Sequence, residues 1–294
     1  MRFRIAETLV VLHAHQMKCL RQVDRRAARS RRLVGSTLLL LAVVGLVWEG
    51  AGLLLIATHV GLARSKLPPF HEVAGRIIDE APLLSTSVWV TARGALIGLA
   101  CGTALGVLVA LFIAQARWLE DAVYPYIIGG QMIPTIALAP VLLIALRNAT
   151  ATRILVATYI TFFAVSVATL KGLKSTSPDA VELMRSYNAS RFEMYRKLRF
   201  PSALPYFFAG LKIAAPLSVV GEIVVELTGA NSGIGYTILV STYYGPAFAT
   251  LFWAALVLTL LLGALFYLGS VRLERLVSPW QHEFRAEHQS LLAP

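Results

Sequence analysis

The sequence predicts an all-α, polytopic membrane protein with about six transmembrane helices and both termini in the cytoplasm. Its 294 residues are 57% hydrophobic and only 15% charged, and the mean hydropathy is +0.67, which argues against a soluble domain with a single core. Long apolar stretches alternate with polar connections. The formal charge of +11 does not indicate nucleic-acid binding, because the basic residues lie in tails and connections rather than on one soluble face.

The apolar stretches define the transmembrane helices, each of which requires about 20 mostly apolar residues. Six stretches satisfy this condition: 33–56, 88–114, 122–146, 154–170, 204–227 and 248–271. The third contains Pro125, Pro134 and Pro140 and the fourth is short, so we expect these two helices to kink and to be covered by neighbouring helices. The predicted parts are a basic cytoplasmic tail at 1–32, a transmembrane domain at 33–280 and a cytoplasmic tail at 281–294.

The distribution of Lys and Arg predicts the orientation. Both tails and the second and fourth connections together hold twenty of these residues. The first and third connections hold five: Arg64, Lys66, Arg76, Arg147 and Arg153. Because the richer side faces the cytoplasm, the termini and the fourth connection are predicted to be cytoplasmic.

The first outer connection, 57–87, contains a Pro-Pro turn at Pro68 and Pro69. Val73, Ile77 and Ile78 follow with helical spacing. The pattern predicts a short helix lying on the outer face.

The sequence of the fourth connection predicts two short helices over 178–200, joined by a tight turn. Ser177 is suited to cap the first helix and Pro178 to begin it. Val181, Met184 and Tyr187 recur on one face. Asn188 is suited to the left-handed conformation that ends a helix.

The second helix of this cytoplasmic hairpin is predicted to start at once. Ser190 and Glu193 have the spacing of a capping box. Phe192, Tyr195 and Leu198 recur on the apolar side of this helix. We expect the helix to end near Arg199, because Pro201 disfavours helical conformation in the residue before it.

Three interpretations of the hairpin compete on the residues alone. The first is an amphipathic surface segment on anionic lipid, which basic residues favour by about 1 kcal/mol each. The second is nucleic-acid binding, for which a short membrane loop supplies no fold. The third is a docking element for a soluble protein, since Met184 and Tyr187 lie beside a sharp turn.

The spacing of this segment resembles a known sequence signature. Glu182, Leu183 and Met184 are followed by three residues and Asn188, and nine further residues lead to Leu198, Arg199, Phe200 and Pro201. The arrangement is similar to the cytoplasmic motif Glu-Ala-Ala, three residues, Gly, nine residues, Ile-x-Leu-Pro of permease subunits of binding-protein-dependent ABC importers. The residues differ at both alanines, at the glycine and in the final apolar pair. Asn for Gly is a mild change, because both tolerate a positive φ.

Two further stretches carry the resemblance, which covers roughly 83–280. The segment "QMIPTIALAPVLL" resembles the third span of the branch that handles nitrate, sulfonate, taurine and bicarbonate. The segment "VVELTGANSGIGYTIL" is similar to the end of the fifth span in the same branch.

The resemblance implies the fold of a type I ABC importer permease in the bacterial cytoplasmic membrane. It implies a homodimer, two ABC ATPase subunits docked on 178–200 and an external substrate-binding protein. The hairpin is then the coupling helix, with these coupling residues: Glu182, Met184, Tyr187, Asn188, Ala189, Ser190, Phe192 and Pro201. The chain contains no G-x-x-x-x-G-K-[ST] phosphate loop, so ATP and Mg²⁺ are expected on the partner ATPase, with no cofactor, metal or catalytic residue in this chain.

Polar residues within the predicted spans are candidates for the translocation path or a gate. Glu222 and Glu226 are four residues apart and share one helical face, and buried charge in a membrane is costly. Either the pair faces the bundle interior, or Glu226 is hydrated at the outer interface. Two carboxylates would repel an anion unless Arg93 or Lys212 neutralises them, and for Arg93 a structural ion pair is favoured over substrate contact.

The substrate is left open between two classes. A small organic anion such as a sulfonate is favoured by the branch, and a heterocycle such as a vitamin precursor is favoured by the two glutamates. An ion-gradient-driven secondary transporter is a further alternative, which an internal repeat of the spans would usually accompany. An intramembrane metalloenzyme lacks the H-E-x-x-H motif.

Overall fold

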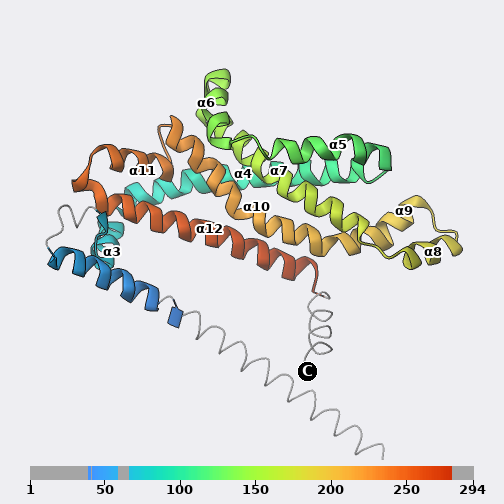
Figure 1. Cartoon of the computed structure of the whole chain (residues 1–294), viewed down its shortest axis with the longest axis horizontal. Coiled ribbons are helices and arrows are strands. Elements are labelled where there is room, and N and C mark those ends of the chain that lie inside the picture. Colours follow the sequence, from blue (N-terminus) through green and yellow to red (C-terminus); the bar gives the residue numbers. More distant parts are fainter. Residues whose placement is uncertain (1–38, 41, 59–65, 280–294) are drawn as a thin grey trace, which may run out of the picture. The chain divides into compact units, whose positions relative to one another are not determined.

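The computed structural model describes residues 39–40, 42–58 and 66–279 (Figure 1). The predicted tails at 1–32 and 281–294, and the start of the first predicted span, lie outside this part of the chain. The chain divides into two compact units, Met1–Glu72 and Val73–Pro294. Each unit is described by itself.

In the first unit, an apolar helix covers Ala42–Ala57. The Trp48 indole Nε1 donates a hydrogen bond to the Pro68 carbonyl oxygen at 2.9 Å, and the His71 backbone N–H donates to Glu49 Oε2 at 3.2 Å. These contacts hold the Pro-Pro turn, after which the predicted short helix begins as α3 (Phe70–Asp79).

In the second unit, the described chain is helical and contains no β-strand. Its elements are α4 (Ala81–Ile113), α5 (Arg117–Gly130), α6 (Thr135–Leu146), α7 (Ala149–Lys174), α8 (Pro178–Ser186), α9 (Arg191–Met194), the π-turn η1 (Tyr195–Arg199), α10 (Phe200–Thr228), α11 (Ile234–Tyr243), the 3-10 turn η2 (Pro246–Phe248) and α12 (Ala249–Val277). The long helix α7 packs along both α4 and α10, and α12 packs along α10 (Figure 1).

Four of the six predicted stretches are single apolar helices of membrane-spanning length in this unit, and a fifth corresponds to a pair of shorter helices. The helices α4, α7, α10 and α12 are long and apolar enough to cross a membrane, and the bent pair α5 and α6 meets the same condition when the two helices are taken together, as a broken span or a re-entrant loop. The first predicted stretch is represented by the helix Ala42–Ala57.

Small residues set the contact between α4 and α7. Gly94, Gly98, Gly102 and Gly106 form one buried line on α4. A Cβ atom at Gly106 would lie 3.0 Å from the carbonyl oxygen of Phe162, so this glycine allows the two helix backbones to approach closely. The helix that approaches α4 along this line is α7.

The predicted kink in the third span is confirmed as a break. The axes of α5 and α6 meet at 91° across Gln131–Pro134. Pro134 is the residue before the first turn of α6, whereas Pro125 and Pro140 lie inside their helices.

One predicted boundary is wrong. The helix α7 begins at Ala149, five residues before the predicted start, because the Asn148 side chain caps it by accepting a hydrogen bond from the Ala151 N–H at 3.0 Å. Arg153 therefore lies in a helix and not in an outer connection. The connection between the predicted stretches 204–227 and 248–271 contains the helix α11, with Gly235 inside that helix.

Candidate functional site

The cytoplasmic hairpin has the local geometry that the sequence predicts. The Ser177 hydroxyl oxygen accepts a hydrogen bond from the Ala180 N–H at 3.3 Å, and Pro178 begins α8. Asn188 has a φ of +54° and its N–H donates to the Arg185 carbonyl at 2.8 Å. The tight turn after α8 is therefore a left-handed helix end.

A reciprocal capping box starts the second half of the hairpin. The Glu193 N–H donates to Ser190 Oγ at 3.2 Å, and the Ser190 N–H donates to Glu193 Oε2 at 3.1 Å. The hydrogen bond from the Ser190 backbone, with the Lys197 ammonium group at 3.0 Å, lowers the pKa of Glu193 to about 2. The carboxylate is therefore ionised at neutral pH and the box is maintained.

Large apolar side chains of the hairpin are exposed. The exposed fractions are 57% for Leu183, 77% for Tyr187 and 71% for Phe192. Of the other predicted coupling residues, Glu182, Asn188 and Ser190 are exposed, and Met184 and Ala189 are half-buried. Exposed aromatic and aliphatic side chains beside a rigid turn are typical of a protein docking surface.

The predicted end of the second helix at Arg199 is wrong, because α9 continues through the π-turn η1 directly into α10. In the π-turn, the Phe200 N–H donates to the Tyr195 carbonyl, five residues back. This wider turn accommodates Pro201, which lacks an N–H and would clash in a regular helix interior. The hairpin is thus joined to a membrane span without a loop.

One hydrogen bond links the hairpin to the cytoplasmic end of α4. The Tyr195 hydroxyl donates to the Ala114 carbonyl oxygen at 3.1 Å. Arg199 donates from Nη1 to the same hydroxyl at 3.0 Å, with its guanidinium carbon 4.9 Å from the centre of the Tyr195 ring. Displacement of the hairpin therefore acts on α4 as well as α10.

Replacing Asn188 tests the turn of the hairpin. Valine, which is β-branched, is expected to destabilise the positive-φ conformation by about 1 to 2 kcal/mol, whereas Asn188→Gly is expected to be neutral. Faster amide hydrogen exchange across α8 in Asn188→Val, but not in Asn188→Gly, would support this. Equal exchange in both variants would show that the turn does not depend on residue 188.

A buried acidic cluster lies toward the other end of α10. Glu226 is 26 residues beyond Phe200, which at ~1.5 Å per residue places it about 40 Å along the helix. Neither Glu222 nor Glu226 is exposed in the structure. The interpretation in which Glu226 is simply hydrated at the outer interface is therefore wrong.

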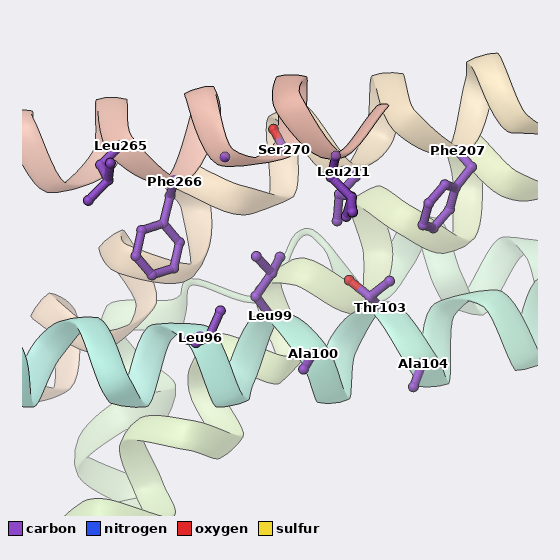
Figure 2. A pocket seen from close by; sticks show the side chains of 12 residues that line it. Leu96, Leu99, Ala100, Thr103, Ala104, Phe207, Leu211, Leu265, Phe266 and Ser270 are labelled. Carbon is purple, nitrogen blue, oxygen red and sulfur yellow. The ribbon is translucent and has the colours of Figure 1, made fainter. Parts of the chain in front are cut away.

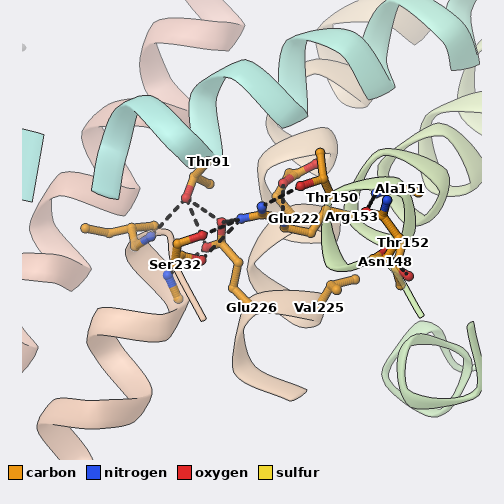
Figure 3. Close-up of polar contacts among 12 residues, drawn as sticks. Thr91, Asn148, Thr150, Ala151, Thr152, Arg153, Glu222, Val225, Glu226 and Ser232 are labelled. Carbon is orange, nitrogen blue, oxygen red and sulfur yellow. Dashed lines mark hydrogen bonds and ion pairs between the residues drawn. The ribbon is translucent and has the colours of Figure 1, made fainter. Parts of the chain in front are cut away.

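Glu226 fixes the turn between α10 and α11 (Figure 3). Its Oε1 accepts a hydrogen bond from Thr91 Oγ1 at 2.8 Å, and its Oε2 accepts one from the Gly235 N–H at 2.8 Å. The Ile234 N–H donates to the same Thr91 hydroxyl at 2.9 Å. Two of the first N–H groups of α11 are thus satisfied by side chains from α4 and α10, as a helix N-terminus requires.

The cation of this cluster is Arg153 of α7. Its Nη1 lies 3.4 Å from Glu226 Oε1, and its Nε lies 3.9 Å from Glu222 Oε2. Nη1 also donates to the Ser232 carbonyl oxygen at 3.2 Å, and Nη2 donates to Thr150 Oγ1 at 3.3 Å. Arg153 therefore connects α7, α10 and the α10–α11 turn.

The ion pair expected for Arg93 is wrong, and Lys212 does not neutralise the two glutamates. Arg93 is exposed on α4 and forms no ion pair with the described residues, although it lines a cavity of 210 Å³ together with Arg153 and Glu222. Lys212 pairs with Glu274 of α12. Asn148, a good helix N-cap residue, was the signal that would have placed Arg153 inside a helix.

Two larger cavities lie between the long helices. One, of 590 Å³, lies between α4, α10 and α12 and is almost wholly apolar, with Thr103 and Ser270 as the hydroxyl-bearing residues (Figure 2). The other, of 540 Å³, lies beside the break between α5 and α6. It is lined by Gln131, Thr135, Tyr159, Ile160, Phe163, Ala164, Val167, Ala168, Lys171, Tyr206, Ala209, Gly210, Ile213 and Leu217.

The cavity at the break was not predicted from the sequence, because its residues come from three segments whose contacts are not local. Within the described residues, no group of three or more His, Cys, Asp or Glu is arranged to hold a metal ion.

Three curated permeases are similar to this chain. A formylaminopyrimidine transport permease of Halalkalibacterium halodurans is 36% identical over 219 residues, covering 73% of this chain and 86% of that protein. A riboflavin transport system permease of Chloroflexus aurantiacus is 28% identical, covering 78% and 87%. A putative aliphatic sulfonates transport permease of Escherichia coli is 28% identical, covering 83% and 91%.

A solved structure shares the fold. A chain of the methionine ABC transporter MetNI in an inward-facing conformation has a TM-score of 0.60 at 21% identity, with coverage of 68% of this chain and 98% of that chain. The likeness confirms the predicted type I importer permease fold.

The family model "Binding-protein-dependent transport system inner membrane component" matches residues 102–279. In such permeases ATP hydrolysis resides in a separate subunit, in agreement with the absence of a phosphate loop in this sequence. The chain belongs to the binding-protein-dependent ABC importer permeases, a family of multi-pass membrane proteins.

Proposed function

We propose that this chain is the permease of an importer for a planar heteroaromatic compound of the vitamin-precursor class. It works as a homodimer in a bacterial cytoplasmic membrane, with two ABC ATPase subunits and an external substrate-binding protein. ATP and Mg²⁺ bind to the ATPase. The permease alternates between outward-open and inward-open states as the ATPase subunits close and separate.

The hairpin is the observation that carries the ATPase-coupled transport in this proposal. Its two caps and the positive φ of Asn188 make it rigid, and its apolar side chains are exposed. The π-turn η1 joins it directly to α10, and Tyr195 bonds it to α4. A push on the hairpin by an ATPase is thereby transmitted to two membrane spans.

The broken span supports a second copy of the chain as the partner. Met132 and Ile133, in the break between α5 and α6, are 77% and 50% exposed, and α6 starts without a side-chain cap. Irregular backbone at membrane depth is tolerated only where protein covers it or where it lines a water-filled cavity. Two copies facing each other across this surface would cover the break with protein and enclose a water-filled path beside it.

The acidic cluster supports a gate at the outer end. Glu226 and Arg153 hold the N-terminus of α11 against α4 and α10, so movement of α11 requires that these contacts separate. In this proposal Glu222 and Glu226 act on the gate, while Arg93 faces the adjoining 210 Å³ cavity.

Two relatives support the substrate class. The formylaminopyrimidine and riboflavin permeases are named for heteroaromatic ring compounds. The second candidate is a small sulfonate, favoured by the relative from Escherichia coli, which aligns over 83% of this chain.

The test is substrate-dependent uptake. The chain would be reconstituted in proteoliposomes with its ATPase and its binding protein, and supplied with ATP and radiolabelled formylaminopyrimidine, riboflavin or taurine. We expect uptake of a heteroaromatic compound and no saturable uptake of taurine. Saturable uptake of taurine without uptake of either ring compound would contradict the proposed substrate class.

A further inference from the structure

We propose that the 540 Å³ cavity beside the break between α5 and α6 is a transmembrane binding site for the heteroaromatic ring of the substrate. This inference rests on the proposed function, since it names where the imported ring is held within the membrane. The volume lies within the roughly 300 to 1,000 Å³ of small-molecule sites.

The location of the cavity is the first argument. It adjoins Gln131, the first residue of the break, and Thr135, the first residue of α6, and α7 and α10 form its other walls. Broken helices in transporters supply backbone groups that bind substrate near the middle of the membrane. Here the first turn of α6 is free of a side-chain cap. The Ala137 N–H already donates to the Pro134 carbonyl oxygen at 3.0 Å, which leaves the Thr135 and Ile136 N–H groups to donate to ring nitrogen or carbonyl acceptors.

A fixed aromatic wall is the second argument. The Tyr159 hydroxyl donates to the Gly130 carbonyl oxygen at 2.5 Å, and its ring meets the Phe163 ring edge to face at 4.8 Å between centroids. Phe163 is 8% exposed. A Cβ atom at Gly130 would lie 2.6 Å from the Phe163 ring, so this glycine is what allows the ring to lie against α5.

Tyr206 on α10 supplies a second aromatic wall. The small residues Ala164, Ala168 and Gly210 line the cavity between α7 and α10. A planar ring fits such a cavity because it can stack on the aromatic side chains, a contact that does not depend on one particular ring system.

The charge of the lining is the third argument. Lys171 is the one charged side chain among the lining residues, and no carboxylate is among them. The carboxylate of Glu222 does not line the cavity. Glu222 is five residues beyond Leu217, the last α10 residue of the cavity, and it lies near Arg153. The Gln131 amide and the Thr135 hydroxyl provide neutral donors and acceptors. The single ammonium group and the neutral polar groups therefore suit a ring that carries carbonyl or ring-nitrogen acceptors at its edge and no positive charge.

The neighbouring apolar cavity provides a matched control. Phe207 follows Tyr206 on α10 and lines the 590 Å³ cavity instead (Figure 2). Truncating one residue or the other removes an aromatic ring of similar size from adjacent positions, but only Tyr206 borders the proposed site.

The experiment measures binding without the binding protein. The permease–ATPase complex in nanodiscs would be titrated with formylaminopyrimidine by calorimetry. We expect saturable binding that Tyr206→Ala weakens about tenfold, with little change in Tyr206→Phe or Phe207→Ala. A monodisperse size-exclusion profile for each complex would show that the variants fold.

Several outcomes would overturn the site. These are no saturable binding by the wild-type complex, wild-type affinity in Tyr206→Ala, or equal weakening by Tyr206→Ala and Phe207→Ala. Failure of the proposed function is separate: it appears as absence of heteroaromatic uptake by the wild-type assembly. Uptake with unchanged affinity in Tyr206→Ala would leave the function standing and overturn the site alone.

Discussion

Replacing Arg153 by methionine is expected to prevent the permease from accumulating in folded form. Glu222 and Glu226 are both fully buried, and Arg153 is the cation of the described structure within 4 Å of either carboxylate. Removing one partner of a buried ion pair costs about 3 to 5 kcal/mol. The yield of monodisperse protein after membrane extraction measures the effect.

Two further variants make the Arg153 experiment specific. Combining Arg153→Met with Glu222→Gln and Glu226→Gln removes the uncompensated charge and is expected to recover much of the yield. Arg93→Met removes an exposed guanidinium and is expected to give a yield close to wild type. If Arg153→Met accumulates to the same yield as Arg93→Met, Arg153 does not stabilise the cluster.

Replacing Tyr187 by aspartate is expected to abolish assembly with the ATPase while leaving the permease folded. The side chain is 77% exposed, so the change buries no charge in the isolated chain. At a docked interface, a buried unpaired carboxylate costs several kcal/mol. Co-purification of the ATPase and its hydrolysis of ATP measure the result.

Tyr243→Asp is the matched control for Tyr187→Asp. Tyr243 is 81% exposed and is the last residue of α11, far from the hairpin along α10. We expect its complex to retain the ATPase. Retention of the ATPase and of coupled hydrolysis by Tyr187→Asp would contradict the docking role of the hairpin.

The hairpin could be predicted almost completely from the sequence. Ser177, Asn188 and the Ser190–Glu193 box act through hydrogen bonds over three or four residues, so local spacing is sufficient. The break of the third span could also be predicted, because Pro134 cannot continue a helix from its preceding residues. The continuous helical segment through Pro201 could not be predicted, because a π-turn accommodates that proline.

The acidic cluster could be predicted only in part. Burial of two glutamates on one face follows from the cost of charge in a membrane, and this inference is confirmed. Which cation compensates them depends on the packing of α7 against α10, and it is Arg153 rather than Arg93. The helix α11 was missed because three glycines near its start favour a loop, whereas Glu226 and Thr91 satisfy its first N–H groups.

The energy source of transport tests the central claim most directly. Proteoliposomes containing the permease, its ATPase and the binding protein would be assayed for formylaminopyrimidine uptake with ATP, and separately with an imposed proton or sodium gradient and no ATP. We predict uptake that requires ATP and that is lost with Tyr187→Asp. Uptake driven by the gradient without ATP or ATPase would contradict the account and support a secondary transporter.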